Sequence, residues 1–399
     1  MKNLIITLSL FITTLYLTAQ APSIEWQKSL GGAQDDYAFS IQQTLDGGYI
    51  VAGDSRSDNG DVTGHYYWSD YWVVKLDSLG IIEWQKSLGG NYDDFANSIQ
   101  QTTDGGYVVA GSSQSTNGDV TGNHGDFDYW VVKLTSTGAM DWQKSLGGTG
   151  NDQAFSIQQT TDGGYIVAGR SSSTNGDVTG NHGISDYWVV KLDSTSTIVW
   201  QKCLGSSYND YASSIQQTTD GGYIVAGGSD YSDGDVTGNH GYYDYWVVKL
   251  DSIGTIAWQK SLGGTGRDLA SFIQQTTDGG YVVAGESDSH DGDVTSYHGG
   301  KEYWVVKLNS MGTIEWQKCL GGTGGDYAKS IQQTTDGSYV IAGFSNSTDG
   351  DVTGNHFGYD YWVVKLSLTV GVNEMTELNE FSVYPNPTSN QITLKANLN

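Results

Sequence analysis

Four acidic positions recur along the chain at a fixed interval, and carboxylates are suited to acid–base catalysis or to holding a hard cation. Together they account for 24 of the 45 Asp and Glu residues. The four series begin at Asp36, Asp46, Asp61 and Asp70 and return every 58 residues. Such repetition predicts an architectural role, because a catalytic site needs different residues that converge once. We expect the Asp46 series to bond the backbone of its own turn, and the Asp36 series to cap its loop or to meet the repeated lysines at Lys28, Lys86 and Lys144.

The Asp61 series opens a loop, GDVTGNHGxxD, that could bind calcium. Its oxygen-bearing side chains alternate and it ends on a carboxylate, as in loops that gather hard ligands. In the second repeat these residues include Asp119, Asn123 and Asp128. The other candidate ligands are the equivalent leading aspartates Asp61, Asp177, Asp235, Asp293 and Asp351. The alternative is a loop held by Asx-type hydrogen bonds, since no single loop concentrates three carboxylates.

Histidine and cysteine complete the chemically versatile residues. The same loop carries a histidine in five repeats (His124, His182, His240, His298 and His356), and His65 lies one place earlier in the first. Symmetry would hold these side chains apart on a rim, so surface roles are favoured over zinc. Cys203 and Cys319 replace a serine in two distant repeats, and we interpret them as small substitutes for it; a disulfide or a reactive thiol is the alternative.

The elements that must position these residues are marked by tryptophan. Two series, from Trp26 and from Trp72, share the 58-residue spacing. Each unit holds four apolar stretches rich in Val, Ile, Tyr and Trp without a 3.6-residue period, so the chain is predicted to be all-β. The Asp-Gly-Gly turns predict tight hairpins with positive φ at both glycines, as at Gly105 and Gly106.

The ends of the repeat region predict a ring. Residues 24–31 match the second strand of a hairpin whose first strand recurs at 361–366. Pairing of these N- and C-terminal strands would remove two open edges and close a six-bladed β-propeller of four-stranded blades. The repeats start near residues 26, 84, 142, 200, 258 and 316, and the propeller spans 21–367.

The flanking segments predict export. Lys2 followed by an apolar run at 4–17 is typical of a signal peptide, which we assign to residues 1–20. Residues 368–379 are interpreted as a linker. The net charge of −26 argues against nucleic acid and against anionic membrane surfaces, and no membrane span is expected.

Two resemblances extend these predictions. The segment 380–399 contains Tyr384-Pro385-Asn386-Pro387-Thr388 and resembles the start of a type IX secretion C-terminal sorting domain, truncated here. The DGGYIVAG units resemble propeller repeats of secreted proteins from the Gram-negative bacteria that use type IX secretion. The resemblance implies a secreted or outer-surface location and the type IX machinery as a partner.

For function, the sequence favours a non-catalytic binding or scaffold module for an extracellular carbohydrate or protein. Exposed aromatic residues at the point where the repeats diverge would suit such a partner. The candidate ligand-binding residues are Tyr66, Tyr67, Trp68, Phe127, Tyr242, Tyr243 and Phe357. The alternatives are a secreted hydrolase or lyase with a site in the central channel, or a purely structural surface protein. No cofactor is expected apart from the calcium discussed above.

Overall fold

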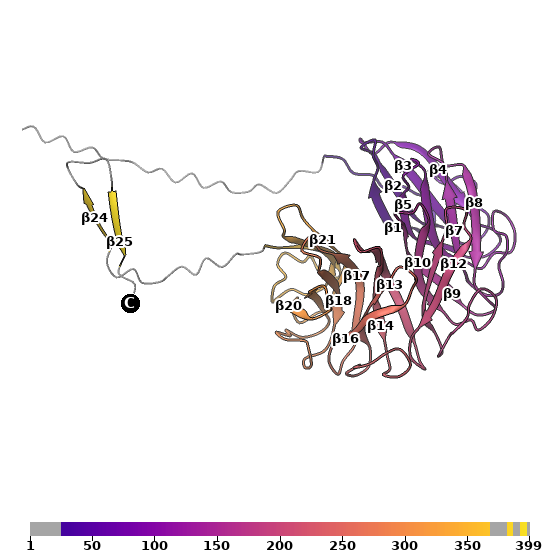
Figure 1. Cartoon of the computed structure of the whole chain (residues 1–399). Helices are drawn as coiled ribbons and strands as arrows, with labels where there is room; N and C mark the ends of the chain where they lie inside the picture. Colours follow the sequence, from indigo (N-terminus) through magenta and orange to yellow (C-terminus); the bar gives the residue numbers. More distant parts are fainter. Residues whose placement is uncertain (1–24, 368–380, 386–391, 397–399) are drawn as a thin grey trace, which may run out of the picture.

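The structure is a computed structural model, and it describes residues 25–367, 381–385 and 392–396 (Figure 1). Within these ranges the regular structure is all β, with twenty-five strands and no helix. A search of the described residues accordingly finds no helix able to cross a membrane. The predicted signal peptide and linker lie outside the described residues.

Six antiparallel sheets follow one another along the chain, and we call them blades 1 to 6. Blade 1 comprises β1 (Asp36–Gln43), β2 (Tyr49–Ser55), β3 (Asp70–Leu76) and β4 (Ile82–Leu88). Blade 2 comprises β5 (Asp94–Gln101), β6 (Tyr107–Ser113), β7 (Asp128–Leu134) and β8 (Met140–Leu146). Blade 3 comprises β9 (Asp152–Gln159), β10 (Tyr165–Ser171), β11 (Asp186–Leu192) and β12 (Ile198–Leu204).

The second half repeats this order. Blade 4 comprises β13 (Asp210–Gln217), β14 (Tyr223–Ser229), β15 (Asp244–Leu250) and β16 (Ile256–Leu262). Blade 5 comprises β17 (Asp268–Gln275), β18 (Tyr281–Ser287), β19 (Glu302–Leu308) and β20 (Ile314–Leu320). Blade 6 has three strands, β21 (Asp326–Gln333), β22 (Tyr339–Ser345) and β23 (Asp360–Leu366). The blades follow one another in a curved arrangement (Figure 1), and first-strand residues of blades 1 to 5 line a central channel. The predicted all-β, six-bladed propeller is confirmed.

An aspartate fixes the turn between the first two strands of each blade, as the sequence predicted. In blade 2, Asp104 Oδ1 accepts hydrogen bonds from Thr102 Oγ1 (2.5 Å) and Gly106 N (2.9 Å). Gly105 has a φ of +81°, which favours glycine. The prediction of positive φ at both glycines was wrong, because the connection has five residues instead of two. Gly106 is needed for space: a Cβ there would lie 2.3 Å from the Leu134 carbonyl oxygen.

An apolar layer joins each blade to the next. At the first interface, Tyr71 and Val73 of blade 1 are buried against Val109 and Trp130 of blade 2. The Tyr71 hydroxyl donates a 2.8 Å hydrogen bond to the Trp130 carbonyl oxygen, and the two ring centroids lie 4.5 Å apart. Because the residues repeat, the same bond recurs at Tyr129–Trp188, Tyr187–Trp246, Tyr245–Trp304 and Tyr303–Trp362.

The predicted pairing that closes the ring is not found among the described strands. Residues 25–35 form no strand, Ile24 lies outside the described residues, and β23 is an edge of its sheet. The interblade face of blade 6 is therefore uncovered, with Tyr361 94% and Val363 64% exposed. On the opposite end of the arc, Ile41 of β1 is also 64% exposed.

The N-terminal segment nevertheless lies against blade 1 as outer strands lie against the following blade elsewhere. The Trp26 ring meets the Tyr49 ring at 5.4 Å, as Trp84 meets Tyr107 at 5.6 Å. Each other outer strand follows the third strand of its own blade after a short turn, as β4 follows β3. The closing pair would join segments some 330 positions apart, so no local turn sets its register.

The C-terminal segment contains a second, small sheet. Strands β24 (Phe381–Pro385) and β25 (Ile392–Ala396) pair antiparallel, with Tyr384 opposite Thr393. Residues 386–388 of the motif on which the sorting-domain resemblance depends lie outside the described residues.

Candidate ligand-binding surface

The fold brings three divergent positions of the repeat together at one end of each blade. They are the second residue of the first strand, the sixth residue of the second strand, and the residue before the third strand. In blade 4, Tyr211 pairs with Gly228 across the sheet, and Tyr243 lies beside Gly228. We call the set of these positions in blades 4 to 6 the variable surface: Tyr211, Gly228, Tyr243, Leu269, Glu286, Lys301, Tyr327, Phe344 and Tyr359.

Aromatic and cationic side chains form a continuous contact series from blade 4 to blade 5. The Tyr243 ring lies 5.8 Å from that of Tyr211 and 4.9 Å from that of Tyr242, which is 60% exposed. The Arg267 guanidinium lies 5.9 Å from the Tyr243 centroid. Glu286 Oε1 then accepts from both Arg267 and Lys301, each at 2.9 Å. A single buried carboxylate thus holds two cations in place.

The series continues into blade 6. Lys301 Nζ lies 5.4 Å from the centroid of Tyr327, which stacks on Phe344 at 4.9 Å. Tyr359 meets both rings edge-on, at 5.9 and 5.3 Å. Lys329 lies over the same two rings at 5.8 and 5.5 Å. These contacts fix the rings, so the surface is largely preorganised for a partner.

An open hollow of about 560 Å³ lies within this surface, between blades 5 and 6. Its lining includes Asp288, Tyr297, Lys301, Tyr327 and Tyr359. Burial raises the pKa of Tyr327 to about 12, with a contribution from its hydrogen bond with Tyr359. Its hydroxyl is therefore protonated at neutral pH. The hollow presents aromatic, cationic and hydroxyl groups to one ligand.

The structure brings together only some of the predicted ligand-binding residues. Tyr242 and Tyr243 belong to the aromatic series above. Phe127 packs against Phe95 in blade 2, at 5.8 Å. The others lie apart: Tyr66, Tyr67 and Trp68 are exposed on blade 1, and Phe357 is 91% exposed on blade 6. The sequence analysis missed Tyr211, Tyr327 and Phe344, although divergence at their repeat positions could have indicated them.

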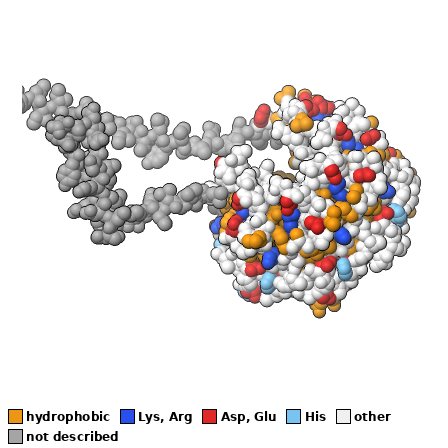
Figure 2. Space-filling model, viewed as in Figure 1, with side chains coloured by type: hydrophobic (Ala, Val, Ile, Leu, Met, Phe, Trp, Pro, Cys, Tyr) orange, Lys and Arg blue, Asp and Glu red, His pale blue; other side chains and the backbone are white. Residues whose placement is uncertain are grey.

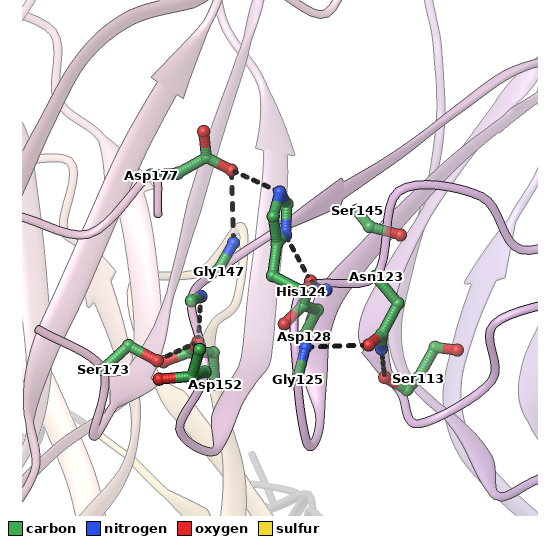
Figure 3. Close-up of polar contacts among 12 residues, drawn as sticks. Ser113, Asn123, His124, Gly125, Asp128, Ser145, Gly147, Asp152, Ser173 and Asp177 are labelled. Carbon is green, nitrogen blue, oxygen red and sulfur yellow. Dashed lines mark hydrogen bonds and ion pairs between the residues drawn. The ribbon is translucent and has the colours of Figure 1, made fainter. Parts of the chain in front are cut away.

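The predicted calcium ligands do not converge. Asp119 Oδ2 accepts from Gly89 N at 3.3 Å, and Asn123 Nδ2 donates to the Ser113 carbonyl at 2.9 Å. Asp128 Oδ2 instead accepts from the backbone of His124 at 2.8 Å (Figure 3). The equivalent aspartates Asp61, Asp177, Asp235, Asp293 and Asp351 likewise approach a backbone amide, at 3.1 to 3.4 Å. Within the described residues no group of three His, Cys, Asp or Glu side chains is arranged to hold a metal.

Each loop histidine pairs with the acid that begins the third strand of its blade. His124 Nδ1 lies 2.6 Å from Asp128 Oδ2, and its Nε2 faces Asp177 of the next blade at 4.0 Å (Figure 3). His182 lies 2.7 Å from Asp186 in the same way. Histidine side chains on the visible face lie apart from one another (Figure 2). The arrangement matches the predicted rim of separate side chains.

Two acidic series meet at each interface between blades. Asp128 and Asp152 flank Gly147, where a Cβ would lie 2.6 Å from an oxygen of each carboxyl (Figure 3). Asp152 accepts from Gly148 N at 2.8 Å and Ser173 Oγ at 2.7 Å, which is the predicted capping role. Burial raises the pKa of Asp128 to about 6 and that of its equivalent Asp70 to about 7. It also raises the pKa of Asp94 and Asp210, the equivalents of Asp152, to about 7.

The lysines that form ion pairs differ from the predicted ones. Lys133, in the third strand of blade 2, lies 2.9 Å from the turn residue Asp104. The same pair recurs at Lys75–Asp46, Lys191–Asp162, Lys249–Asp220, Lys307–Asp278 and Lys365–Asp336. The expected partners, Lys28, Lys86 and Lys144, form no ion pair within the described part of the chain. Lys86 and Lys144 lie on outer strands, β4 and β8, and Lys28 lies in the N-terminal segment that forms no strand.

Both cysteines are free and buried, so the disulfide alternative is excluded. Burial raises the pKa of Cys319 to about 12, with nearby Glu302 contributing. Cys203 has a raised pKa for the same reason. Their thiols are therefore poor nucleophiles, in agreement with a role as substitutes for serine.

The central channel, of about 300 Å³, is lined by first-strand residues that repeat from blade to blade. The glutamines are engaged in joining blades: Gln100 Oε1 accepts from Gln159 N at 2.6 Å. Ser98 Oγ likewise accepts from Ile157 N at 3.3 Å. At the position of Phe272, the other blades that line the channel have a serine: Ser40, Ser98, Ser156 and Ser214.

The fold defines a β-propeller, and comparisons with known proteins add little further detail. No known family model matches the chain. Regulatory protein FlaEY of Caulobacter vibrioides is 24% identical over a 422-residue alignment covering 93% of this chain and 42% of that protein. The chain therefore spans less than half the length of this relative.

Similar solved structures include the Pan2 WD40 domain of Neurospora crassa and a DUF4221 family member from Bacteroides vulgatus. The first has a TM-score of 0.43 and 12% identity, over 76% of this chain and 74% of its own. The second has a TM-score of 0.42 and 12% identity, over 85% of this chain and 96% of its own. Neither similarity assigns a ligand or a reaction to this chain.

Proposed function

We propose that this propeller is a non-catalytic binding module that docks a protein partner on the variable surface of blades 4 to 6. The observation that carries the proposal is the aromatic–cation series from Tyr242 to Tyr359. It lies where the repeats differ, whereas the interblade core repeats closely. A surface that serves one specific partner needs such local individuality on a constant scaffold.

The composition of the surface favours a protein. Tyrosine and arginine are enriched among residues that dominate protein–protein binding energy, because they combine large apolar area with hydrogen bonding. Tyr242 and Tyr359 project into solvent, while Tyr243, Arg267 and Tyr327 support them. The variable surface contains the cation Lys301, and the cations Arg267 and Lys329 lie against its aromatic rings. Since the chain as a whole is strongly acidic, an acidic patch on the partner would be complementary to these cations.

Support for a non-catalytic role comes from the channel. Its glutamine and serine side chains join neighbouring blades, and a hydrolase or lyase there would need differently placed groups. A secreted or outer-surface location, with delivery by type IX secretion through residues 380–399, belongs to the same proposal. It is supported by the resemblance of Tyr384-Pro385-Asn386-Pro387-Thr388 to the sorting domain.

The proposal can be tested by cross-linking. A photoreactive amino acid at Tyr242 should capture one protein from the outer-surface fraction of producing cells, and the purified partner should then bind the intact propeller. Tyr243→Ala or Tyr327→Ala should weaken that binding at least about tenfold, as expected for interface anchors.

The control is Tyr67→Ala, which removes an exposed tyrosine on blade 1. It should leave the affinity within about twofold, since surface residues outside a contact are usually near-neutral. Equal affinity of Tyr243→Ala, Tyr327→Ala and the unaltered chain would refute the proposed surface.

A further inference from the structure

Two equivalent pockets lie at the outer side of successive blade interfaces, away from the residues of the variable surface. The pocket between blades 3 and 4 has a volume of about 510 Å³, and the one between blades 4 and 5 about 500 Å³. The first is lined by residues that include Thr179, His182, Gln201, Lys202, Asp235 and Ile256. The second has the same residues 58 positions later, with Lys260 and Asp293 among them. Volumes of this size accommodate small ligands.

The histidine of each pocket is held in one orientation. His182 Nδ1 lies 2.7 Å from Asp186 Oδ2, and the same carboxylate oxygen accepts from the His182 backbone. The other nitrogen, Nε2, faces Asp235 Oδ2 at 3.9 Å, beyond hydrogen-bond distance. The preceding interface has the same arrangement, with His124 between Asp128 and Asp177 (Figure 3). Two ligand hydroxyls could therefore donate there, one to Nε2 and one to the carboxylate.

The glutamine is fixed as well. Gln201 Oε1 accepts a 2.8 Å hydrogen bond from the Trp188 indole, and its Nε2 donates to Thr179 Oγ1. Gln201 Nε2 also donates to the Thr179 carbonyl oxygen at 3.2 Å, so the Thr179 hydroxyl hydrogen is the group left for a ligand. The pocket therefore presents polar groups whose positions are set before binding, which lowers the entropic cost of binding.

The lysine has no structural partner in the described residues. Neither Lys202 nor Lys260 forms an ion pair or a side-chain hydrogen bond there, although the third-strand lysine of every blade is paired with a turn aspartate. The blade therefore holds one repeated lysine that its own framework does not use, at the wall of a repeated pocket.

From this set we propose that each pocket binds one neutral sugar unit, so that the propeller is multivalent for glycans. Lysine and threonine donate, aspartate accepts, and Leu204 and Ile256 offer apolar contact to the C–H face of the ring. Opposite charges on Lys202 and Asp235 leave the pocket without a net preference for a strongly charged ligand. Repetition raises avidity for a polymer whose units reach several pockets. The inference does not depend on the partner of the variable surface.

The chain contains an internal contrast. At the interface between blades 1 and 2, Tyr66 stands at the position of the histidine, and Asp119 is the equivalent of Asp235. The Tyr66 phenol interacts with Asp119, which with burial raises the tyrosine pKa. The acceptor that elsewhere faces the histidine is thus engaged by the protein, and we expect no sugar at this interface.

The test uses the full chain, with methyl glycosides of glucose, galactose and mannose as probes in isothermal titration calorimetry and saturation-transfer NMR. At least one glycoside should bind at two or more equal sites per chain. Lys202→Gln should lower the number of sites by one without changing the affinity of the rest. The double variant Lys202→Gln/Lys260→Gln should lower it by two.

Lysine was chosen because no bond within the described residues depends on it, so these variants should fold. Tyr243→Ala, which tests the variable surface, should leave the number of sugar sites unchanged. Inorganic phosphate should not compete with the glycoside. The proposal is overturned if no glycoside binds at tens of millimolar, if one site alone binds and is lost in Tyr243→Ala, or if the double lysine variant keeps every site.

Discussion

The hydroxyl of Tyr187 in blade 3 donates a 2.9 Å hydrogen bond to the carbonyl oxygen of Trp246 in blade 4. Both side chains are fully buried, and their ring centroids lie 4.6 Å apart. The bond therefore links neighbouring blades inside an apolar layer, where water cannot replace it.

Removal of this hydroxyl should destabilise the propeller. Tyr187→Phe should lower the free energy of unfolding by about 0.5 to 1.5 kcal/mol, the usual net contribution of one hydrogen bond. Chemical denaturation followed by tryptophan fluorescence measures the change. Tyr242→Phe, at an exposed ring, should stay within about 0.5 kcal/mol. Similar losses in the two variants would show that the interblade bond has no special role.

Buried carboxyls should make stability fall as the pH rises from acid to neutral. Burial raises the pKa of Asp210 from the unfolded value of 3.8 to about 7. The folded state then binds the proton more tightly, so this stabilisation is complete below about pH 4 and lost as the pH approaches 7. In Asp210→Asn the decline should be shallower, as measured by denaturant titrations at several pH values. An unchanged slope would contradict the raised pKa.

The turn aspartates should act in the opposite direction. Hydrogen bonds from Thr44, Lys75 and Gly48 lower the pKa of Asp46 to about 2. Its stabilisation is present above the unfolded value of 3.8 and is lost as the pH falls toward 2. We expect Asp46→Asn to flatten the loss of stability below pH 4 while leaving the decline between pH 4 and 7 intact. A change confined to the neutral range would contradict this assignment.

The uncovered face of blade 6 should be covered in solution by blade 1. Its residues match those buried at other interfaces, and exposed apolar faces favour association. Val363→Asp should therefore lower the free energy of unfolding by at least about 2 kcal/mol, approaching the effect of Val305→Asp. Ile253→Asp, at a turn residue 66% exposed, should have little effect. If Val363→Asp has as little effect as Ile253→Asp, the face of blade 6 stays uncovered in solution.

Calcium should have no effect on the melting temperature, since Asp119, Asn123 and Asp128 are engaged by the protein's own groups. We expect the melting temperatures in 5 mM CaCl2 and in EDTA to agree within about 1 °C. This calcium concentration is roughly 10³ times a micromolar dissociation constant, so a site of that affinity would be saturated. A drop of several degrees in EDTA would show that an ion rearranges these loops and would restore the calcium proposal.

The sequence by itself determined the blades. The 58-residue spacing of Trp26 and its equivalents set their number, and Asp104 before two glycines set a hairpin, because both depend on residues close in the chain. The all-β class followed from apolar stretches without helical period. The same local information could not distinguish a two-residue turn from a five-residue turn. The turn is decided by the hydrogen bonds that the Asp104 carboxylate accepts.

Contacts between distant residues were decided by the tertiary structure alone. The pairing of lysines with turn aspartates, the aromatic series from Tyr211 to Tyr359, and the pocket shared by His182 and Asp235 each join segments that the chain separates. Repetition reveals which residues recur, but every copy contains several Lys and Asp that could pair. Only the arrangement of neighbouring blades brings one of these pairs within bonding distance. For that reason the residues of the site could not be predicted from the sequence.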